Sequence, residues 1–470
     1  MTGATGRSDH RLGKFDPAWL SLPFGVTVAS GVLLYAPIDT DMARMLAITV
    51  FCISLWIGTP VDPWFTGLIG IGLIGTVFTS ELALVGFRSP ATWLVVLGIL
   101  LGEATRQSGL AAVIERLSFN ILPSETGSDA TVAYRYLLIV LSAVALGFVV
   151  LIPSSLVRVL ILGPILISIG EVFTERRPRI GLFLGPLFVT YYAGTGILTG
   201  SLANIIIMGL VETNADVSVG WVEWAMWLGP VMSIGRAVVV TGIAYILYRP
   251  RDPGAIDAAV DTDSSPEAPA TAYRMIAFLF LGVAIWATDT IHGLHPLYGA
   301  LAVTLLAFAP QIGVVGSDAV GNADVSIVFF LGAIFAIAEG LQQTAFTNLA
   351  AEVILSNFPQ NESLVVALLF LVVAALALTF IMEGLAVASV LTPVLVSFSE
   401  SVGLPLTPVI MTEAIALNTY FFPYQSAVLV AILGLDVVDS IELIRMTALC
   451  SLVTLLVLLP IQILIFAAAF

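Results

Sequence analysis

The sequence predicts an all-α polytopic membrane protein with about 11 transmembrane helices plus two re-entrant hairpins, arranged in two inverted-topology repeats. Hydrophobic residues make up 59% of the 470 and charged residues only 10%, and the mean hydropathy is +1.05. A soluble chain is about 25% charged. Apolar runs long enough to cross a hydrocarbon core of about 30 Å recur from end to end. The order of these runs repeats after a polar segment near the middle of the chain.

The same composition limits the other classes of function. Apolar runs fill the chain and leave no room for a soluble catalytic domain, so we expect no enzymatic activity. The net charge of −15 argues against binding to nucleic acid. Both cysteines lie within apolar runs, which indicates packing residues and neither a disulfide framework nor a metal cluster.

The chain divides into four parts. The polar N-terminal tail, 1–18, has no signal-peptide cleavage site, which predicts a cytoplasmic segment. The first inverted repeat covers 19–248 and the second covers 272–470. Between them, 249–271 is rich in Pro, Asp and Ala and predicts a flexible cytoplasmic linker.

The first repeat opens with apolar runs that predict four spans, at 19–38, 43–59, 63–79 and 91–113. A run from Tyr134 to Ile169 is then interrupted at Pro153, which predicts a re-entrant hairpin. The next run, 181–213, is broken by a Gly- and Thr-rich stretch, and broken helices are costly in lipid unless they line a site. A span at 221–248 begins with three tryptophans, which we assign to the membrane interface.

The second repeat shows the same order. Its predicted elements are spans near 272–290, 296–315 and 324–345, an interrupted run at 363–400, a broken helix at 406–435 and a last run at 441–470. Corresponding residues of the two halves keep an offset between 225 and 236. Glu103 and Glu339 each precede a glutamine by four residues, so we expect each pair to meet on one helix face as a packing contact.

Basic residues predict the orientation. Loops flanking the first interruption hold several arginines, whereas loops 346–362 and 401–405 around the second interruption hold none. Because arginine-rich loops stay on the cytoplasmic side, the two halves should be inverted relative to one another. We therefore expect a multi-pass protein of the cell membrane, with a cytoplasmic N-terminus and an external C-terminus.

Motifs at the interruptions carry a family resemblance. The stretches Ser154–Pro164 and Glu383–Pro393 each end in proline at the eleventh position, and the first helix break reads G-S-L-A-N from Gly200 to Asn204. Paired broken segments in inverted repeats are the plan of secondary transporters. From about Arg44 to Phe470 the chain resembles the divalent anion:sodium symporter family, which carries dicarboxylates, citrate and sulfate.

The resemblance implies a secondary active transporter that is coupled to sodium or protons and carries a small divalent anion such as a dicarboxylate or sulfate. It also implies a homodimer that works by an elevator motion and needs no cofactor besides the coupling ion, Na⁺ or H⁺. The implied substrate-binding residues are Ser154, Ser155, Arg158, Thr199, Ser201, Asn204, Glu383, Gly384, Leu385, Gln425 and Ser426. The implied sodium-binding residues are Ser154, Ser155, Gly200, Asn204, Glu383, Gly384 and Ser426.

Arg158 and Glu383 stand out because isolated charges inside a membrane are costly and usually functional. Our hypothesis is that Arg158 binds the anion in bidentate fashion; the alternative is a snorkelling side chain or a structural ion pair. Glu383 would repel a dianion if ionised, so it should be protonated, paired with Arg158 or bound to a cation. Proton coupling follows from the first of these, and structural pairing is the alternative.

Two other functions remain open. A cation/proton antiporter or an arsenite-type carrier of the same superfamily is favoured by the altered tip motifs and by Glu383. A transport-dead membrane sensor would need a catalytic or signalling constellation, which the sequence does not offer. The partners expected in every case are the lipid bilayer, a small solute and a coupling cation.

Overall fold

The computed structural model describes residues 17–120, 129–215, 217–254, 269–357, 363–381 and 384–470. All secondary-structure elements in these ranges are helices. Seven are long and apolar enough to cross a membrane, and helices α17 and α18 form a further candidate that is bent by 76°. Six more apolar helices of 10 to 17 residues are too short to cross alone. The all-α polytopic class is confirmed, and much of the crossing is built from short pieces.

The helices of the first half run from residue 21 to residue 248. They are α1 (Ser21–Tyr35), α2 (Thr40–Gly58), α3 (Pro63–Val77), α4 (Ser80–Ala83), α5 (Pro90–Gln107), α6 (Leu110–Asn120), α7 (Ala130–Leu151), α8 (Ser155–Gly170), α9 (Arg176–Tyr192), α10 (Leu202–Ala215), α11 (Trp221–Leu228) and α12 (Arg236–Tyr248). A π-helical segment, Gly229–Gly235, joins α11 to α12.

The helices of the second half follow the same order. They are α13 (Ala270–Ala287), α14 (Asp289–His292), α15 (Pro296–Phe308), α16 (Asp318–Asn322), α17 (Ile327–Gln343), α18 (Phe346–Asn357), α19 (Leu364–Thr379), α20 (Gly384–Val402), α21 (Leu406–Leu417), α22 (Ala427–Leu433), α23 (Ser440–Val453) and α24 (Leu459–Ala469). A π-helical segment, Thr454–Leu458, again interrupts the last span. The repeat boundaries and their inversion stay predictions, and most of the tail and linker lies outside the described residues.

Two bends differ from the sequence prediction. The span expected at 91–113 ends at Gln107, and the chain turns at Gly109, whose φ is +83°, before α6 begins. The segment expected as a loop at 346–362 contains α18, which follows a turn at Ala345 with φ +59°. A left-handed residue cannot continue a right-handed helix, so each long apolar run becomes two helices at an angle.

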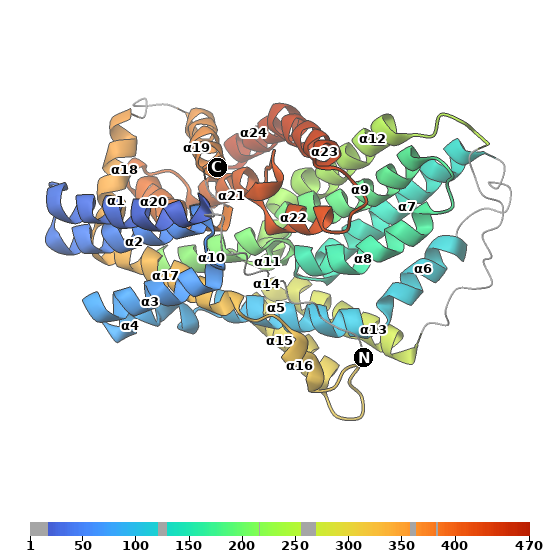
Figure 1. Cartoon of the computed structure of the whole chain (residues 1–470), viewed down its shortest axis with the longest axis horizontal. Coiled ribbons are helices and arrows are strands. Elements are labelled where there is room, and N and C mark those ends of the chain that lie inside the picture. The colour runs from blue at the N-terminus through green and yellow to red at the C-terminus, as the bar shows by residue number, and fades with distance from the viewer. Residues whose placement is uncertain (1–16, 121–128, 216, 255–268, 358–362, 382–383) are drawn as a thin grey trace.

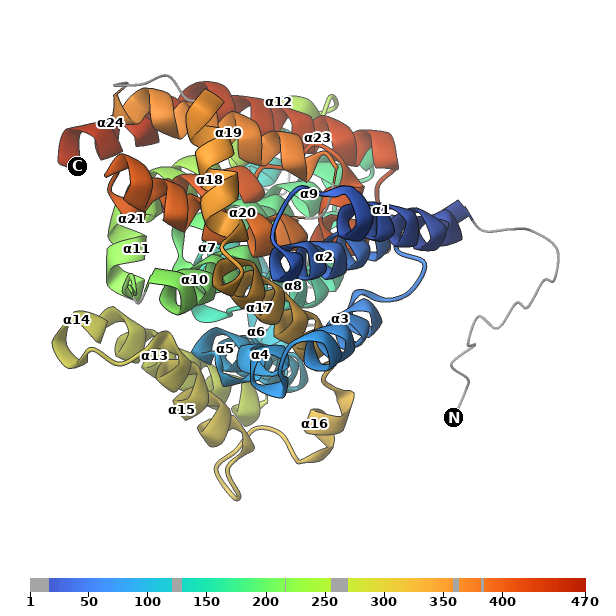
Figure 2. The same cartoon turned by 90° about the vertical axis from the view of Figure 1, so that its left-hand side faces the viewer.

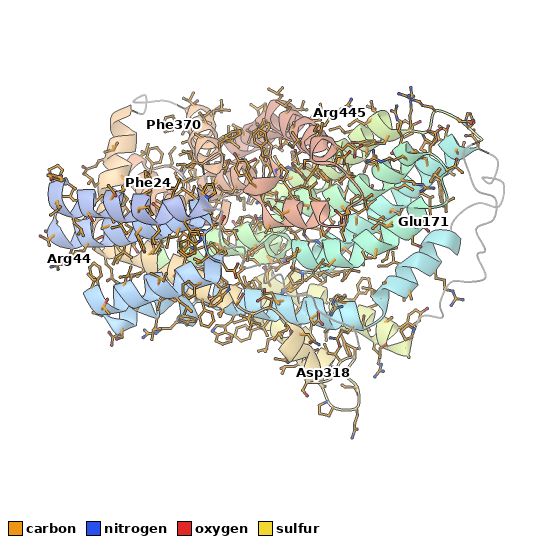
Figure 3. The ribbon with its side chains drawn as sticks, viewed as in Figure 1. Phe24, Arg44, Glu171, Asp318, Phe370 and Arg445 are labelled. Atoms are coloured by element: carbon orange, nitrogen blue, oxygen red, sulfur yellow. The ribbon has the colours of Figure 1, made fainter. Side chains whose placement is uncertain are left out.

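The helices form layers around a buried centre. In both views α13, α15 and α16 lie at the bottom and α12, α19, α23 and α24 lie at the top (Figures 1 and 2). Charged residues such as Arg44, Glu171 and Asp318 lie at the periphery, and Phe24 on the outer helix α1 is 63% exposed (Figure 3). Every residue of α21 from Pro408 onward is buried, as are nearly all of α9. The halves α9 and α21 of the two broken helices therefore run through the protein core and not along lipid.

Candidate functional site

The first helix break, residues 193–201, separates α9 from α10. Two short 3₁₀ turns, Ala193–Gly196 and Leu198–Gly200, carry the chain between them. A Cβ on Gly194 would lie 2.5 Å from the carbonyl oxygen of Gly200, and a Cβ on Gly200 would lie 2.7 Å from that of Gly194. The backbone thus passes so close to itself that only glycine fits at both positions.

Asn204 holds this break in shape. Its Nδ2 donates to the carbonyl oxygens of Gly194, Thr195 and Ile197 at 3.2, 3.1 and 2.9 Å. Other donors also reach these carbonyls: the backbone N–H groups of Ile197 and Gly200 donate to Gly194 and Ile197, and the indole of Trp224 donates to Thr195. Asn204 therefore binds the break through its amide nitrogen, while its amide oxygen accepts a hydrogen bond from Asn418.

Arg158, on the first turn of α8, inserts its guanidinium into the break and is fully buried. Nε donates to Thr190 Oγ1 at 2.6 Å, and Nη1 donates to the Ile152 carbonyl at 2.5 Å. Nη2 contacts the Gly200 carbonyl at 2.6 Å, and the Thr190 carbonyl and Ser155 Oγ at 2.9 Å. The positive charge thus lies at the carboxyl end of α9, where the helix dipole is negative.

The second break, residues 418–426, separates α21 from α22 and is organised by Gln425. Its Oε1 accepts from the backbone N–H groups of Phe421 and Phe422 at 2.7 and 2.8 Å. Its Nε2 donates to the Thr379 carbonyl, at the end of α19, at 3.0 Å. Ser426 caps α22 by accepting from the N–H of Val428. This hydrogen bond therefore joins the second break to α19, the helix that precedes the second interruption.

The two breaks meet at Asn418. Ser201 Oγ donates to Asn418 Oδ1 at 2.7 Å, and Asn418 Nδ2 donates to Asn204 Oδ1 at 3.2 Å. Tyr192 also donates from its hydroxyl to the Tyr420 carbonyl at 3.2 Å. Residues more than 200 positions apart thus form one buried polar centre.

Arg236 is a second buried guanidinium at this centre, and it contacts both breaks. Nη1 donates to Thr195 Oγ1 at 2.7 Å and to the carbonyls of Tyr192 and Asn418 at 3.2 Å. Nη2 donates to Thr419 Oγ1 at 3.1 Å. Arg236 begins α12, directly after the π-helical segment, so this irregular turn places its side chain between the carboxyl ends of α9 and α21.

The predicted site residues divide into three groups. The first group surrounds the first break: Arg158 donates to Ser155 and Gly200. The same group includes Ser201 and Asn204, which both form hydrogen bonds with Asn418. Gly384 lies against the second break, since its Cβ would be 3.2 Å from the Leu417 carbonyl, and Gln425 and Ser426 belong to that break. Ser154 caps α8, Thr199 accepts from the indole of Trp221, and Leu385 follows Gly384 on α20. Glu383 lies outside the described residues, so its role stays a prediction.

Comparison with known proteins decides the family. The transmembrane region that defines the sodium:sulfate symporters matches residues 20–467. The chain belongs to the sodium:sulfate symporter family. It is thus a membrane transporter of a family of dicarboxylate and other anion carriers, and not an enzyme, which confirms the resemblance seen in the motifs.

The sodium:sulfate symporter fold extends to distant relatives. The L-tartrate/succinate antiporter of Escherichia coli UTI89 is 22% identical over 463 residues, which is 94% of this chain and 91% of the relative. That of strain K12 is 22% identical over 437 residues, covering 88% of this chain and 85% of the relative. The structure of the Alcanivorax borkumensis YdaH transporter has a TM-score of 0.61 at 16% identity and covers 92% of this chain and 99% of its own.

Several buried polar residues of this sodium:sulfate symporter family member were missed from sequence. Arg236 and Glu413 are ionisable groups inside apolar runs, so the rule that singled out Arg158 would also have found them. Asn418 carries no such signal, because a lone asparagine after an apolar helix is also a common helix end. The tryptophans open a span as predicted, but Trp221 and Trp224 are buried against the first break, where they donate to Thr199 and to the Thr195 carbonyl.

Proposed function

We propose that this protein is a secondary active transporter of a small divalent anion, such as a dicarboxylate or sulfate, coupled to sodium or protons. The observation that carries the proposal is the charge of the buried centre. Arg158 and Arg236 contribute two positive charges, and among the described residues neither forms an ion pair with a carboxylate. Because unneutralised charges are costly away from water, a dianion bound between the breaks would be strongly stabilised.

The amino end of α10 adds to this field, because α10 begins directly after the first break and its amino end is positive. Ser201, Asn204, Gln425 and Ser426 supply polar groups around the buried centre. The homodimer and the elevator motion that the family resemblance implies belong to the same proposal.

The position of Arg158 bears on the coupling ion. Its guanidinium lies among oxygens of Ser155 and Gly200, which are two of the residues expected to bind sodium. A permanently charged group in that place competes with an exchangeable cation. We therefore propose that the coupling ion is a proton or a sodium ion at the second interruption, near Gly384 and Ser426.

A second candidate is exchange of one anion for another. The same position of Arg158 favours it, because a fixed positive charge can replace a cation that would otherwise enter and leave with the substrate. The distant relatives named L-tartrate/succinate antiporters agree with such a cycle.

An uptake panel in proteoliposomes tests both candidates. Radiolabelled succinate, tartrate, sulfate and arsenite are each offered with and without a sodium gradient, with and without a pH gradient, and with and without the same unlabelled solute inside. We expect saturable uptake of a dianion. Uptake driven by a gradient indicates coupling, whereas uptake only into preloaded vesicles indicates exchange. Uptake of arsenite alone, or of none of the four, would contradict the proposal.

A further inference from the structure

One buried carboxyl has no part in the site described so far. Glu413 lies on α21, one turn before this half-helix ends at the second break, and its side chain is 1% exposed. Its Oε1 accepts a hydrogen bond from Thr392 Oγ1 on α20 at 2.9 Å. Within the described part of the chain, Oε2 has no hydrogen-bond partner.

Charged neighbours do not neutralise Glu413. α21 packs against α10, α19, α20 and α24, and in their described parts these helices carry two titratable side chains, Glu212 and Glu400. Glu212 pairs with His295 at 3.3 Å, and Glu400 is exposed. Arg236 reaches α21 only at the backbone, with its Nη2 3.5 Å from the carbonyl of Ile415. The structure shows no ion pair between Glu413 and any described residue.

An ionised carboxylate in this place would be unstable. Removing an ion from water without a partner costs several kcal/mol, whereas burying a neutral polar group that lacks one hydrogen bond costs about 1–3 kcal/mol. The carboxyl is therefore neutral in the state described here, with its proton on Oε2. A group of this kind takes up a proton when it is buried and releases it when water reaches it.

The hydrogen bond from Thr392 to Glu413 lies where the backbone hydrogen bonds of α20 are interrupted. Thr392 is followed by Pro393, which lacks an N–H and so interrupts the hydrogen-bond ladder of the helix. The same helix begins at Gly384, the second tip, which lies against the end of α21. A small movement of this tip relative to α21 would break the Thr392 contact and open Glu413 to water.

We propose that Glu413 binds the coupled proton: its carboxyl is protonated in this state and releases the proton to water when α20 moves away from α21. This inference rests on the proposed function and names its coupling ion. It places proton coupling in the second half of the chain, whereas the first half carries the fixed charge of Arg158. The only covalent bond formed or broken is that between the proton and Oε2.

The variant Glu413→Gln tests the proposal, because an amide keeps the acceptor for Thr392 but cannot titrate. Infrared spectra of the full-length protein in liposomes at neutral pH should show the carbonyl band of a protonated carboxyl in the wild type, reduced in the variant. An unchanged band would overturn the proposal. This measurement needs no substrate, so it stands even if no anion in the uptake panel is carried.

Proton movement is the second readout. A pH-sensitive dye inside the vesicles should report a change of lumen pH during succinate or sulfate uptake by the wild type, and no change during uptake by Glu413→Gln. Glu339→Gln is the matched control, because Glu339 is bonded to Gln343 and should leave proton movement intact. Proton movement of wild-type size in Glu413→Gln would overturn the proposal, while anion uptake would still support the transport function.

Thr392→Val keeps the test decisive if Glu413→Gln does not fold. Losing the hydroxyl removes the one hydrogen bond that the described residues donate to the Glu413 carboxyl and that favours its ionised form, so the pH at which uptake is half-maximal should rise. An unshifted midpoint would overturn the proposal.

Discussion

Arg158 shows how a buried positive charge is stabilised by neutral groups. Its contacts are three carbonyls and two hydroxyls, and hydrogen bonds to a charged group are worth about 1.5–3 kcal/mol each. The sequence places Arg158 directly after the first interruption, and it predicted a functional role for this residue because a charge in an apolar run is costly. It could not predict which oxygens surround the guanidinium, because Thr190 and Gly200 reach it only through the fold. Binding of the anion by Arg158 itself stays a prediction.

Replacing Arg158 should therefore destabilise the protein in proportion to the donors lost. Arg158→Lys keeps the charge but offers three donors in another geometry, and Arg158→Met removes all five hydrogen bonds that the guanidinium donates. We expect the melting temperature in detergent to fall for Lys and further for Met, since each hydrogen bond to a charged group contributes about 1.5–3 kcal/mol. Arg106→Lys is the control, because Arg106 forms an exposed pair with Glu103 and should change little. Equal effects at both sites would contradict this account.

At the scale of single helices, the sequence predicted most elements but not all their bends. Pro153 located the first interruption, and the shared register of Pro164 and Pro393 located the second. Polar stretches within apolar runs located both broken helices. The two glutamate–glutamine contacts are confirmed, at 2.6 Å for Glu103 and 2.7 Å for Glu339. The turn at Ala345 was not predictable, because alanine disfavours positive φ and only packing around α17 and α18 makes it adopt one.

Contact between α3 and α17 gives a prediction at this scale. A Cβ on Gly67 would lie 2.5 Å from the Phe329 carbonyl oxygen, whereas a Cβ on Gly72, on the same helix, meets nothing within 4 Å. Gly67→Ala should thus lower the melting temperature, because backbone atoms must move apart. Gly72→Ala should be neutral or stabilising, since alanine favours a helix over glycine by about 1 kcal/mol. A similar change in both variants would show that α3 and α17 are not in close contact.

Across the whole molecule, the halves share an order of elements but not a distribution of charge. Both have a bent helix pair, a tip, a broken helix and a last span with a π-helical segment. Arg158 belongs to the first half only and Glu413 to the second only. The shared order of elements could be predicted from the constant offset between corresponding residues of the two halves. The hydrogen bonds of Asn418 and Arg236 that join the two breaks could not be predicted, because they form between segments far apart in the sequence.

Cysteine labelling tests the predicted orientation. The native thiols Cys52 and Cys450 are buried and should not react. Asp252→Cys lies in the expected cytoplasmic linker, and Ile291→Cys lies beyond the span α13 at an 83% exposed position. An impermeant maleimide on intact cells should label position 291 and not 252, and should label both after permeabilisation. The opposite pattern would reverse the assigned orientation, and labelling of both in intact cells would contradict a span between them.

The hydrogen bonds of Asn418 and Arg236 also constrain how the protein can open. Pulling the two breaks apart would expose the carbonyls of Tyr192 and Asn418 together and separate the pair of asparagines. A conformational change that leaves these hydrogen bonds intact requires the ends of α9 and α21 to move together as one rigid body. We then expect the solute to enter and leave past Ser155 and Gly384, each of which contacts a break, and not between the two halves.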